Sequence, residues 1–387
     1  MSDQAKTEVQ DLDQGQNRVG TFTFLSSAEL SLLKDPNFVE GLAKGRTLSQ
    51  QDSEILQDIC STLRDTGTMP FSWTPQEAHY IDGHGQEKWL DYIIYRYKFT
   101  LFPRKKIVSD FPVYLLIEPA STCNLRCVMC FQVDKTFTRK PYMGLMDMGL
   151  FREVVDQAVS GGTQAVTLAS RGEPTLHPQL GEMLEYLAGK FIEVKLTTNA
   201  TKLTEKLCHQ ILETGVNMLV LSVDAHTKSV YEDIRVRGKF DDVEKNIRMF
   251  HRIREEFYPT SNLATRISGV RLREDQDPAG FKAFWGEIVD EVGMKDAMER
   301  WDTYANDPNL ELTSPCWFLW ERMYIWFDGS TNPCDPDYKS HLSPGNVREQ
   351  GIHDIWHGDA LTKLRTDHLN GRRTEHFPCD RCNLSFE

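Results

Sequence analysis

The stretch Cys123-Asn124-Leu125-Arg126-Cys127-Val128-Met129-Cys130 places three cysteines within eight residues, separated by three residues and then by two. An apolar run at 113–117 comes shortly before it and is typical of a buried strand. The three thiols are therefore expected on a loop just past the carboxyl end of a strand, where α/β barrels carry their active sites.

Three cysteine ligands suit a four-iron cluster that takes only three of its four ligands from the protein. One iron is then open, and open metal positions are typical of catalytic sites, whereas structural sites are closed. A zinc site would be expected to draw on two paired groups of ligands. The spacing therefore favours a reactive iron–sulfur cluster at Cys123, Cys127 and Cys130 over zinc.

The C-x3-C-x2-C spacing resembles the signature of radical S-adenosylmethionine (SAM) enzymes. The resemblance implies that the open iron binds the amino and carboxylate groups of SAM. It also implies that the reduced cluster cleaves SAM to a 5′-deoxyadenosyl radical, which abstracts a hydrogen atom from the substrate. A reductant such as flavodoxin or ferredoxin is the partner that this chemistry implies.

Composition and charge narrow the class of protein further. The chain has 387 residues, 40% of them apolar, and a formal net charge of −13. This acidic balance argues against a nucleic-acid binder, which needs basic residues to displace counterions. No apolar run reaches the length of a membrane span, and the N-terminus lacks the basic-then-apolar pattern of a signal peptide. We therefore expect a cytoplasmic protein with no nucleic-acid or membrane partner.

From residue 111 onward, predicted strands and helices alternate. Strands are predicted at 113–117, 165–169, 193–197, 218–223 and 265–270, with a weaker sixth at 298–303. Helices are predicted at 148–159, 178–190, 203–214, 227–235, 241–256 and 281–292. Such alternation indicates an α/β fold with a parallel sheet and helices outside it. Six units are too few for a closed barrel, so we predict a partial (β/α)6 radical SAM barrel spanning 111–305.

The first 110 residues are predicted to form a tail and a helical extension. Residues 1–20 are polar and aperiodic, as is typical of a mobile tail. Ser26 and Glu29 have the spacing of a capping box, before an amphipathic stretch that runs to Gly45. A second helix is predicted at 50–66, and the aromatic residues that follow are expected to pack on the main domain.

A second polar stretch, residues 170–178, follows the second predicted strand. Gly172 permits a close backbone approach, and the carboxylate of Glu173 can hold a cationic amino group. The stretch is similar to the Gly-Gly-Glu-Pro motif of radical SAM enzymes, which binds the amino group of SAM, although Arg171 replaces the first glycine. The alternative is a plain helix-entry turn with Pro178 at the first helical position, which explains the proline but not the glutamate.

Three further residues complete the predicted SAM site. Ser222 lies at the end of the strand at 218–223, and Arg235 closes the helix at 227–235. By resemblance to the family, these two hold the carboxylate of SAM, and Asn199, after the third strand, contacts the ribose. The alternative is an ordinary strand-end hydroxyl and a solvated helix-end charge.

Four more cysteines lie near the end of the chain: Cys316, Cys334, Cys379 and Cys382. Four thiolates can close either an iron–sulfur cluster or a zinc site. The pattern C-x12-G-x4-C that begins this group resembles the start of SPASM and twitch domains, which carry auxiliary clusters. The resemblance implies an iron–sulfur domain at 306–387 with one auxiliary 4Fe-4S cluster. The remaining cysteines, Cys60 and Cys208, lie on apolar helix faces and are predicted to be structural.

A closed auxiliary cluster cannot bind substrate, so its expected role is to accept an electron from a substrate radical. This favours a net oxidation, such as alcohol to ketone. The resemblance to twitch and SPASM enzymes implies that the substrate is a sugar, nucleotide-sugar or aminocyclitol-like small molecule. Arg266, which faces one side of a predicted strand, is the candidate catalytic residue. The enzymatic alternatives are peptide modification and sugar epimerisation. A non-catalytic iron–sulfur or zinc-binding protein is the alternative from another class, but it gives Glu173, Ser222 and Arg235 no role.

Overall fold

The computed structural model describes residues 18–20, 27–297 and 303–385. At their centre is a sheet of nine strands in the order β1-β7-β6-β5-β4-β3-β2-β8-β9. Neighbouring strands from β2 to β7 run parallel, and β8 runs parallel to β2. Strands β1 and β9 add antiparallel edges, and the described strands do not close into a ring. The predicted α/β fold with an open, partial barrel is thereby confirmed.

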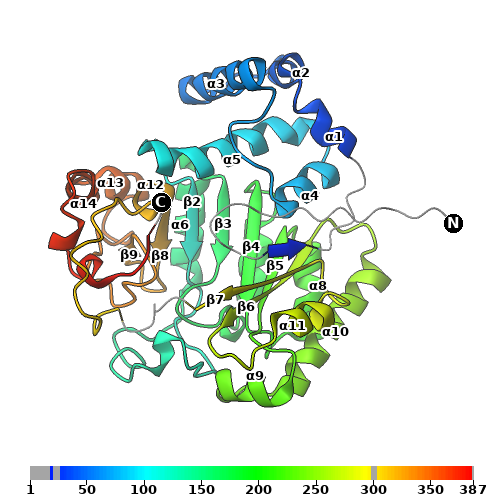
Figure 1. Cartoon of the computed structure of the whole chain (residues 1–387), viewed down its shortest axis with the longest axis vertical. Helices are drawn as coiled ribbons and strands as arrows, with labels where there is room; N and C mark the ends of the chain where they lie inside the picture. Colours follow the sequence, from blue (N-terminus) through cyan, green and yellow to red (C-terminus); the bar gives the residue numbers. More distant parts are fainter. Residues whose placement is uncertain (1–17, 21–26, 298–302, 386–387) are drawn as a thin grey trace.

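The elements alternate along the chain as predicted, with helices between successive parallel strands (Figure 1). The strands are β1 (Arg18–Gly20), β2 (Tyr114–Ile117), β3 (Ala165–Leu168), β4 (Glu193–Thr198), β5 (Met218–Ser222), β6 (Ala264–Arg271), β7 (Glu291–Asp296), β8 (Arg322–Ile325) and β9 (Thr331–Asn332). The N-terminal helices are α1 (Ser27–Leu32), α2 (Pro36–Gly41), α3 (Gln50–Thr66), α4 (Pro75–Gly83) and α5 (Gln86–Lys105). The barrel helices are α6 (Met148–Gly161), α7 (Leu180–Leu187), α8 (Glu205–Glu213), α9 (Lys228–Ile234), α10 (Phe240–Phe257) and α11 (Pro278–Trp285). The C-terminal helices are α12 (Phe318–Glu321), α13 (Ile352–His357) and α14 (Asp359–Leu369).

The N-terminal helices form a layer across one end of the sheet (Figure 1). Helix α5 shares an apolar core with α3 and with the starts of β2 and β3. Tyr95 of α5 donates a hydrogen bond of 3.0 Å to Glu193, the first residue of β4. This layer therefore covers the amino ends of the parallel strands and leaves their carboxyl ends to the loops.

The inner face of the sheet is partly polar and accessible. In β5, Leu219 and Leu221 belong to the core shared with the helices. The alternate residues Val220 and Ser222 are only half-buried and face the other way. The face that carries Leu219 and Leu221 is therefore a dry core, whereas the inner face that carries Val220 and Ser222 can receive a polar ligand.

The sixth strand of the parallel sheet differs from its prediction. The helix predicted at 281–292 ends at Trp285 as part of α11, and the chain enters β7 at Glu291. The sequence of β7, Glu-Val-Gly-Met-Lys-Asp, has one β-branched residue and no aromatic residue, and its two acids, lysine and glycine weaken the usual strand pattern. The weaker strand predicted at 298–303 lies almost entirely outside the described residues.

The N-terminal extension also departs in part from its prediction. Pro36 begins a new helix, so the stretch predicted to run to Gly45 is divided into α1 and α2. Residues 18–20, predicted as part of the tail, form β1 against β7. The helix predicted at 50–66 is confirmed as α3. The rest of the predicted tail, and Ser26 of the predicted capping box, lie outside the described residues.

The C-terminal elements share the central sheet rather than standing apart from it. Strand β8 pairs with β2, with Arg322 opposite Tyr114. Strand β9 returns antiparallel beside β8. Helices α13 and α14 lie near this edge of the sheet (Figure 1). The parts of the chain on either side of the predicted boundary near residue 306 therefore contribute strands to the same sheet.

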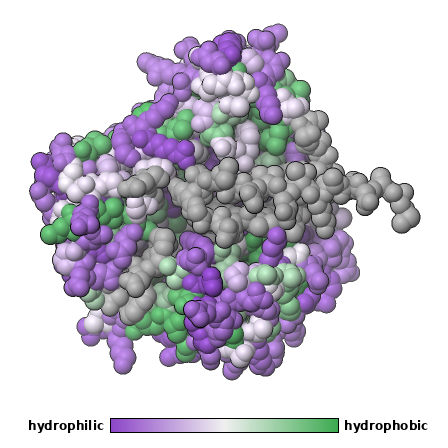
Figure 2. All heavy atoms as spheres, in the orientation of Figure 1, coloured by the Kyte–Doolittle hydropathy of each residue, from purple (hydrophilic) through white to green (hydrophobic). Residues whose placement is uncertain are grey.

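The surface carries scattered rather than massed apolar residues. In Figure 2, hydrophobic residues lie dispersed among hydrophilic ones on the visible face. Scattered apolar residues are ordinary for a folded protein. Among the helices that the structure describes, none has the length and apolar character needed to cross a membrane.

Candidate functional site

The three clustered cysteines lie on a loop that follows β2, as predicted. Backbone hydrogen bonds hold this loop against the end of α9. The N–H of Arg126 donates to the carbonyl of Val236 at 3.0 Å. The N–H of Val128 donates to the carbonyl of Ile234, also at 3.0 Å. Because Arg235 lies between these two carbonyls, the backbone fixes it beside the loop.

The three thiols form one group with shared electrostatics. Burial, with smaller contributions from Glu173 and Cys127, raises the pKa of Cys123 to about 11. Burial, with contributions from the two other thiols, raises the pKa of Cys130 to about 12. The thiolate is the form that binds metal, so a cation must offset this cost. The donor set therefore fits the iron of a cluster.

Gly172 brings the turn after β3 against the backbone that leads into the cysteine loop. A Cβ at this position would lie 2.2 Å from the carbonyl oxygen of Ala120 and 2.5 Å from that of Thr122. The N–H of Glu173 donates to the same Thr122 carbonyl at 2.8 Å. The close backbone approach predicted for Gly172 is present, and glycine alone permits it.

Glu173 is buried, and its carboxylate already has several partners. Oε1 accepts hydrogen bonds from the hydroxyls of Thr175 and Thr198, both at 2.6 Å, and from the N–H of Thr175 at 3.1 Å. Oε2 accepts one, from the N–H of Asn199, at 2.7 Å. Burial raises the pKa of Glu173, and these hydrogen bonds oppose the rise. The side chain thus ties the turn after β3 to the end of β4, and Oε2 is the oxygen with capacity for a cationic amino group.

Asn199 joins the end of β4 to the cysteine loop. Its side-chain N–H2 donates to Asn124 Oδ1 at 3.1 Å and lies 3.9 Å from the sulfur of Cys123. Its Oδ1 accepts from the hydroxyl of Thr201 at 2.6 Å. These contacts give Asn199 a role in positioning the loop, and its predicted contact with the ribose stays a prediction.

Arg235 is held by a buried carboxylate next to the cysteine loop. Its Nε lies 2.5 Å from Oδ2 of Asp224, whose side chain is completely buried. The other oxygen of Asp224 accepts from the N–H of Val270 at 2.9 Å. Burial raises the pKa of Cys127, and the charge of Arg235 lowers it. Sequence reasoning missed Asp224 as the group that orients this arginine, although it lies only two residues after Ser222.

Ser222 and Arg266 share the inner face of the sheet. Ser222 ends β5 and lies opposite Ser268 of β6. Arg266 comes two residues before Ser268, and therefore points to the same side one layer below the rim. It forms an ion pair with Glu291, with Nε 3.4 Å from Oε1, and Gly293 leaves room for its guanidinium.

The structure adds Glu118 and Arg171 to the candidate site. The Arg171 side chain stands where the family motif has glycine, and it pairs with Glu118 at the end of β2. Ser170, just before it, has a φ of +137°, a conformation that L residues rarely adopt. The arginine at a position where the family motif has glycine was the sequence signal for this pair. The sequence did not identify Glu118 as the partner of Arg171.

The four C-terminal cysteines form a second group. Cys316 precedes α12, Cys334 follows β9, and the last two lie at the end of the described chain. Burial, with a contribution from the neighbouring Cys382, raises the pKa of Cys316 to about 11. Burial also raises the pKa of Cys379 and of Cys334, and each is raised further by Cys316 and Cys382. These mutual effects are those expected of four neighbouring thiols.

Two buried nitrogen–hydrogen donors beside this group have no partner. His368 accepts a hydrogen bond at Nδ1 from the N–H of Cys316, 3.2 Å away, so its Nε2 carries the proton. Burial and the charge of Arg373 lower the pKa of His368 to about 3, so the ring is neutral. The Nε2 of His368 and the Nε of Arg373 are both buried without a hydrogen-bond partner. Donors of this kind fit the sulfur atoms of an iron–sulfur cluster.

Neither group is arranged as a site for a single ion. No three His, Cys, Asp or Glu side chains in the described parts of the chain are placed to hold one metal ion. In a cluster, the cysteines bind different iron atoms, so they stand farther apart than the ligands of one ion.

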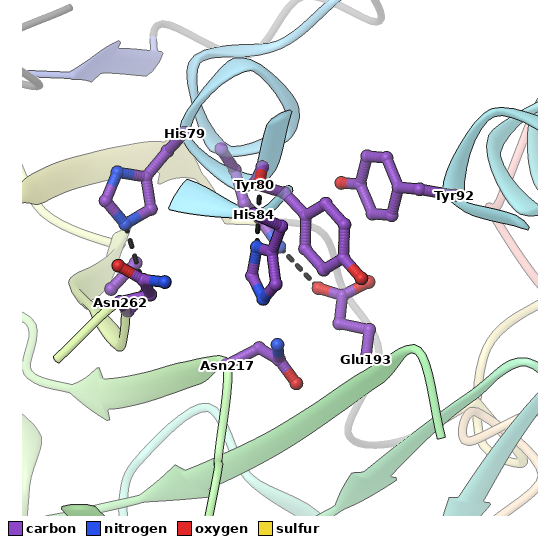
Figure 3. A pocket seen from close by; sticks show the side chains of 9 residues that line it. His79, Tyr80, His84, Tyr92, Glu193, Asn217 and Asn262 are labelled. Atoms are coloured by element: carbon purple, nitrogen blue, oxygen red, sulfur yellow. Dashed lines mark hydrogen bonds between the residues drawn. The ribbon is translucent and has the colours of Figure 1, made fainter. Parts of the chain in front are cut away.

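A small pocket lies at the opposite end of the sheet (Figure 3). It is lined by residues of α4, α5 and the starts of β4 and β6, including Tyr80, Tyr92 and Glu193. Gln76 donates to Glu193 at 2.6 Å. Glu193 opens β4, whereas Asn199 of the candidate site follows the end of that strand. The pocket is therefore separate from the cysteine loop.

Family comparison identifies the class of protein that this fold and site define. A sequence profile of the Radical SAM superfamily matches residues 117–265. The chain belongs to the radical SAM superfamily. A second profile, the SPASM iron-sulfur cluster-binding domain, matches residues 316–383. The protein is thus a radical SAM enzyme with a C-terminal SPASM domain, whose cofactors are SAM, the 4Fe-4S cluster that binds it, and auxiliary iron–sulfur. The roles of individual residues stay predictions.

Several known proteins are similar to the chain. The S-adenosyl-L-methionine-dependent 2-deoxy-scyllo-inosamine dehydrogenase of Niallia circulans is 24% identical over 272 residues, which are 69% of this chain and 91% of that protein. The antilisterial bacteriocin subtilosin biosynthesis protein AlbA of Bacillus subtilis is 23% identical over 306 residues, 71% of this chain and 66% of that protein. Two other curated relatives match over only 30% and 50% of their own lengths. The crystal structure of Streptococcus suis SuiB bound to precursor peptide SuiA has a TM-score of 0.52 at 14% identity, covering 93% of this chain and 92% of that one, and it has the same fold.

Proposed function

We propose that this protein is a radical SAM dehydrogenase that oxidises an alcohol of a sugar, nucleotide-sugar or aminocyclitol-like small molecule. The placement of the nine cysteines carries the proposal. Seven belong to the two groups that hold iron–sulfur, and the other two are buried in helices α3 and α8. A radical epimerase must return a hydrogen atom to its substrate, and a cysteine thiol is a common donor. A dehydrogenase needs no such donor.

The surroundings of the two remaining thiols support net oxidation. Cys60 is 3% exposed in the N-terminal layer, with its sulfur 3.7 Å from the carbonyl of Pro36. Cys208 is completely buried in the core between α8 and the sheet. Burial raises the pKa of Cys208 to about 12. Both thiols therefore serve packing, and neither faces the cysteine loop.

The proposed oxidation balances without a further oxidant. When bound, SAM and a cluster held by Cys123, Cys127 and Cys130 would supply the radical chemistry that removes one hydrogen atom from the carbinol carbon. The substrate would then lose its hydroxyl proton and one electron, which an auxiliary cluster held by the four C-terminal cysteines would accept. The products are a ketone, 5′-deoxyadenosine, methionine and a proton. The four-thiolate group supports this route because a closed cluster transfers electrons without binding substrate.

The inner face of the sheet suits a polyhydroxylated substrate. Thr197, Ser222, Arg266 and Ser268 all face inward and are half-buried. Hydroxyls and a guanidinium on a concave wall are groups that fix the orientation of a polar ligand. Arg266 is our candidate for contact with the reacting part of the substrate. Gly293, which lies opposite Ser268, leaves room for its guanidinium. The name of the Niallia circulans relative, a dehydrogenase of an aminocyclitol, supports the same substrate class.

Peptide modification is the second candidate function. It is favoured by the Bacillus subtilis relative, whose name refers to bacteriocin biosynthesis and which matches 71% of this chain. In that case the substrate would be a ribosomal peptide and the auxiliary cluster would take up the same electron. A reductant such as flavodoxin or ferredoxin is the proposed partner in both cases.

The test is turnover with defined substrates. Anaerobically reconstituted protein, reduced by flavodoxin and its reductase, would be incubated with SAM and a panel of sugars, nucleotide-sugars and aminocyclitols. We expect one ketone for each 5′-deoxyadenosine with at least one panel member, measured by mass spectrometry. An epimer as product, or SAM cleavage that only a peptide stimulates, would contradict the proposal.

A further inference from the structure

Arg373 is completely enclosed beside the four C-terminal cysteines. It follows α14 and is 1% exposed. Nη1 donates to the carbonyl of Ser314 at 3.2 Å, and Nη2 donates to the carbonyls of Leu384 at 2.8 Å and Cys382 at 3.5 Å. Ser314 lies two residues before Cys316. The guanidinium therefore bridges two of the segments that supply the thiols.

The charge of Arg373 has no carboxylate partner among the ion pairs of the described residues. Its neighbour Arg372 differs in every respect: its side chain is 46% exposed and pairs with Asp367. Burying a guanidinium without an opposite charge is unfavourable, so buried charges are usually paired. The thiols of Cys316 and its three partners, as thiolates, can supply that opposite charge.

The geometry also leaves one donor of Arg373 unused. Its Nε is buried and has no hydrogen-bond partner, whereas both terminal nitrogens are satisfied by carbonyls. A protein rarely buries a donor without an acceptor. Thiolate and sulfide sulfurs accept hydrogen bonds, so a cluster on Cys316 and its three partners would satisfy both the charge and the donor.

We propose that Arg373 is the counter-ion of the auxiliary iron–sulfur cluster and holds its reduction potential high enough to accept the substrate electron. The proposal rests on the assignment of that cluster to the four C-terminal cysteines. One-electron reduction adds negative charge to a site that already holds four thiolates, and a fixed cation stabilises the reduced form more than the oxidised form. Arg373 acts through the cluster and is a positioning residue, not a catalytic one.

The test isolates the auxiliary cluster in the Cys123→Ala, Cys127→Ala, Cys130→Ala protein. Iron content and an EPR-monitored reductive titration would be measured for this parent and for Arg373→Met, Arg373→Lys and Arg372→Met in the same background. In Arg373→Met we expect the ratio of reduced to oxidised cluster at a fixed potential to fall at least tenfold, which is about 59 mV for one electron. Arg373→Lys keeps the charge and should change the ratio less than threefold. Arg372→Met, the matched control, should leave it unchanged.

Each outcome decides one point. An unchanged potential in Arg373→Met, or an equal shift in Arg372→Met, would overturn the proposal. If Arg373→Met does not retain iron, Arg373→Lys decides: iron with a nearly unchanged potential supports the counter-ion role. Loss of iron from both variants, or a tenfold change in Arg373→Lys, would mean that the shape of arginine matters and not its charge. A parent without iron would instead refute the four-cysteine assignment and the electron route of the proposed function.

Discussion

Arg171 and Glu118 form a bidentate ion pair between the ends of β3 and β2, with Nη2 2.6 Å from Oε1 and Nε 2.8 Å from Oε2. The side chains are 2% and 0% exposed. Nη1 of the same guanidinium donates to the carbonyl of Tyr338 at 3.0 Å, and its carbon lies 4.1 Å from the ring centre of Trp326. Arg171 therefore joins the turn that carries Gly172 to the C-terminal domain.

Replacing Arg171 by the glycine usual in the family motif should destabilise the protein. Arg171→Gly leaves the buried carboxylate of Glu118 without its cationic partner, with only the backbone N–H groups of residue 171 and Phe327 as donors. Breaking a buried pair in this way costs about 3–5 kcal/mol. The measurement is thermal unfolding of the anaerobically reconstituted protein. Combining Arg171→Gly with Glu118→Gln should recover part of the loss. Equal melting temperatures for wild type and Arg171→Gly would show that the pair is not structural.

A second ion pair links the cysteine loop to the C-terminal domain. Asp134 lies 2.7 Å from Nζ of Lys339 and accepts a hydrogen bond from the hydroxyl of Tyr338 at 2.9 Å. Burial alone would raise the pKa of Asp134, but hydrogen bonds from Lys339, Thr136 and Tyr338 lower it well below its usual range. A lowered pKa in the folded state means that the stabilisation is complete above the unfolded pKa of about 3.9 and is lost only at lower pH.

Asp134→Asn should therefore lower stability by about 1.5 kcal/mol, the lower end for hydrogen bonds to a charged group, because the carboxylate is partly exposed. The difference in melting temperature from wild type should be constant between pH 8 and pH 5. Asp241→Asn is the matched control, because Asp241 pairs with Lys228 on the open surface, where an ion pair contributes little. A difference that shrinks within this pH range would assign the effect to another titrating group.

Removing the first cysteine group tests the assignment of the SAM cluster. The protein with Cys123, Cys127 and Cys130 all changed to alanine should retain the iron of the auxiliary site only. It should make no 5′-deoxyadenosine from SAM, because SAM binds at the open iron of the lost cluster. Iron and sulfide analysis gives the first result, and chromatography gives the second. Continued cleavage of SAM would contradict the assignment.

Glu173→Gln tests the predicted hold on the amino group of SAM. A hydrogen bond to a charged group contributes about 1.5–3 kcal/mol, so Kd for SAM should rise about 10- to 150-fold while cluster content stays intact. Thr198→Ala is the control, because it removes one donor to Oε1 and leaves the negative charge and Oε2 unaltered. Isothermal titration with SAM measures both variants. Equal losses in the two would mean that the turn, rather than the charge of Glu173, is responsible.

Strand β2 could be predicted because it is a short apolar run between turn residues, at 113–117. Strand β7 has no such run, and it was not predicted. Helix α5 could not be predicted in this way. It is buried on several sides, so apolar residues surround its whole circumference and no helical period marks one face. The pairing of β8 with β2 joins segments about two hundred residues apart, and nothing in either segment specifies its partner.

The candidate site was predictable where a single residue carries the signal. Gly172 is an example, because only glycine permits the observed contact with the carbonyl of Ala120. Partners across the fold were not predictable. Glu118 and Arg171 are 53 residues apart, and Asp224 meets Arg235 only after α9 turns the chain back. Buried charges need partners, but the sequence alone does not say which carboxylate each arginine meets.

Turnover in deuterated water separates dehydrogenation from epimerisation. An epimerase returns a hydrogen atom from an exchangeable group, so its product would carry stable deuterium at the reacting carbon. A dehydrogenase makes a carbonyl at that carbon and adds no solvent hydrogen to it. The buried positions of Cys60 and Cys208 lead us to expect one oxidised substrate per SAM cleaved, with no deuterium at the reacting carbon.

The measurement is mass spectrometry of the product, worked up without borohydride so that the carbonyl is not reduced. The Cys60→Ala and Cys208→Ala variants are measured beside wild type. Both variants should retain the product and its yield per SAM, since neither thiol takes part. Stable deuterium that disappears in Cys60→Ala would assign Cys60 as a hydrogen-atom donor and establish epimerisation.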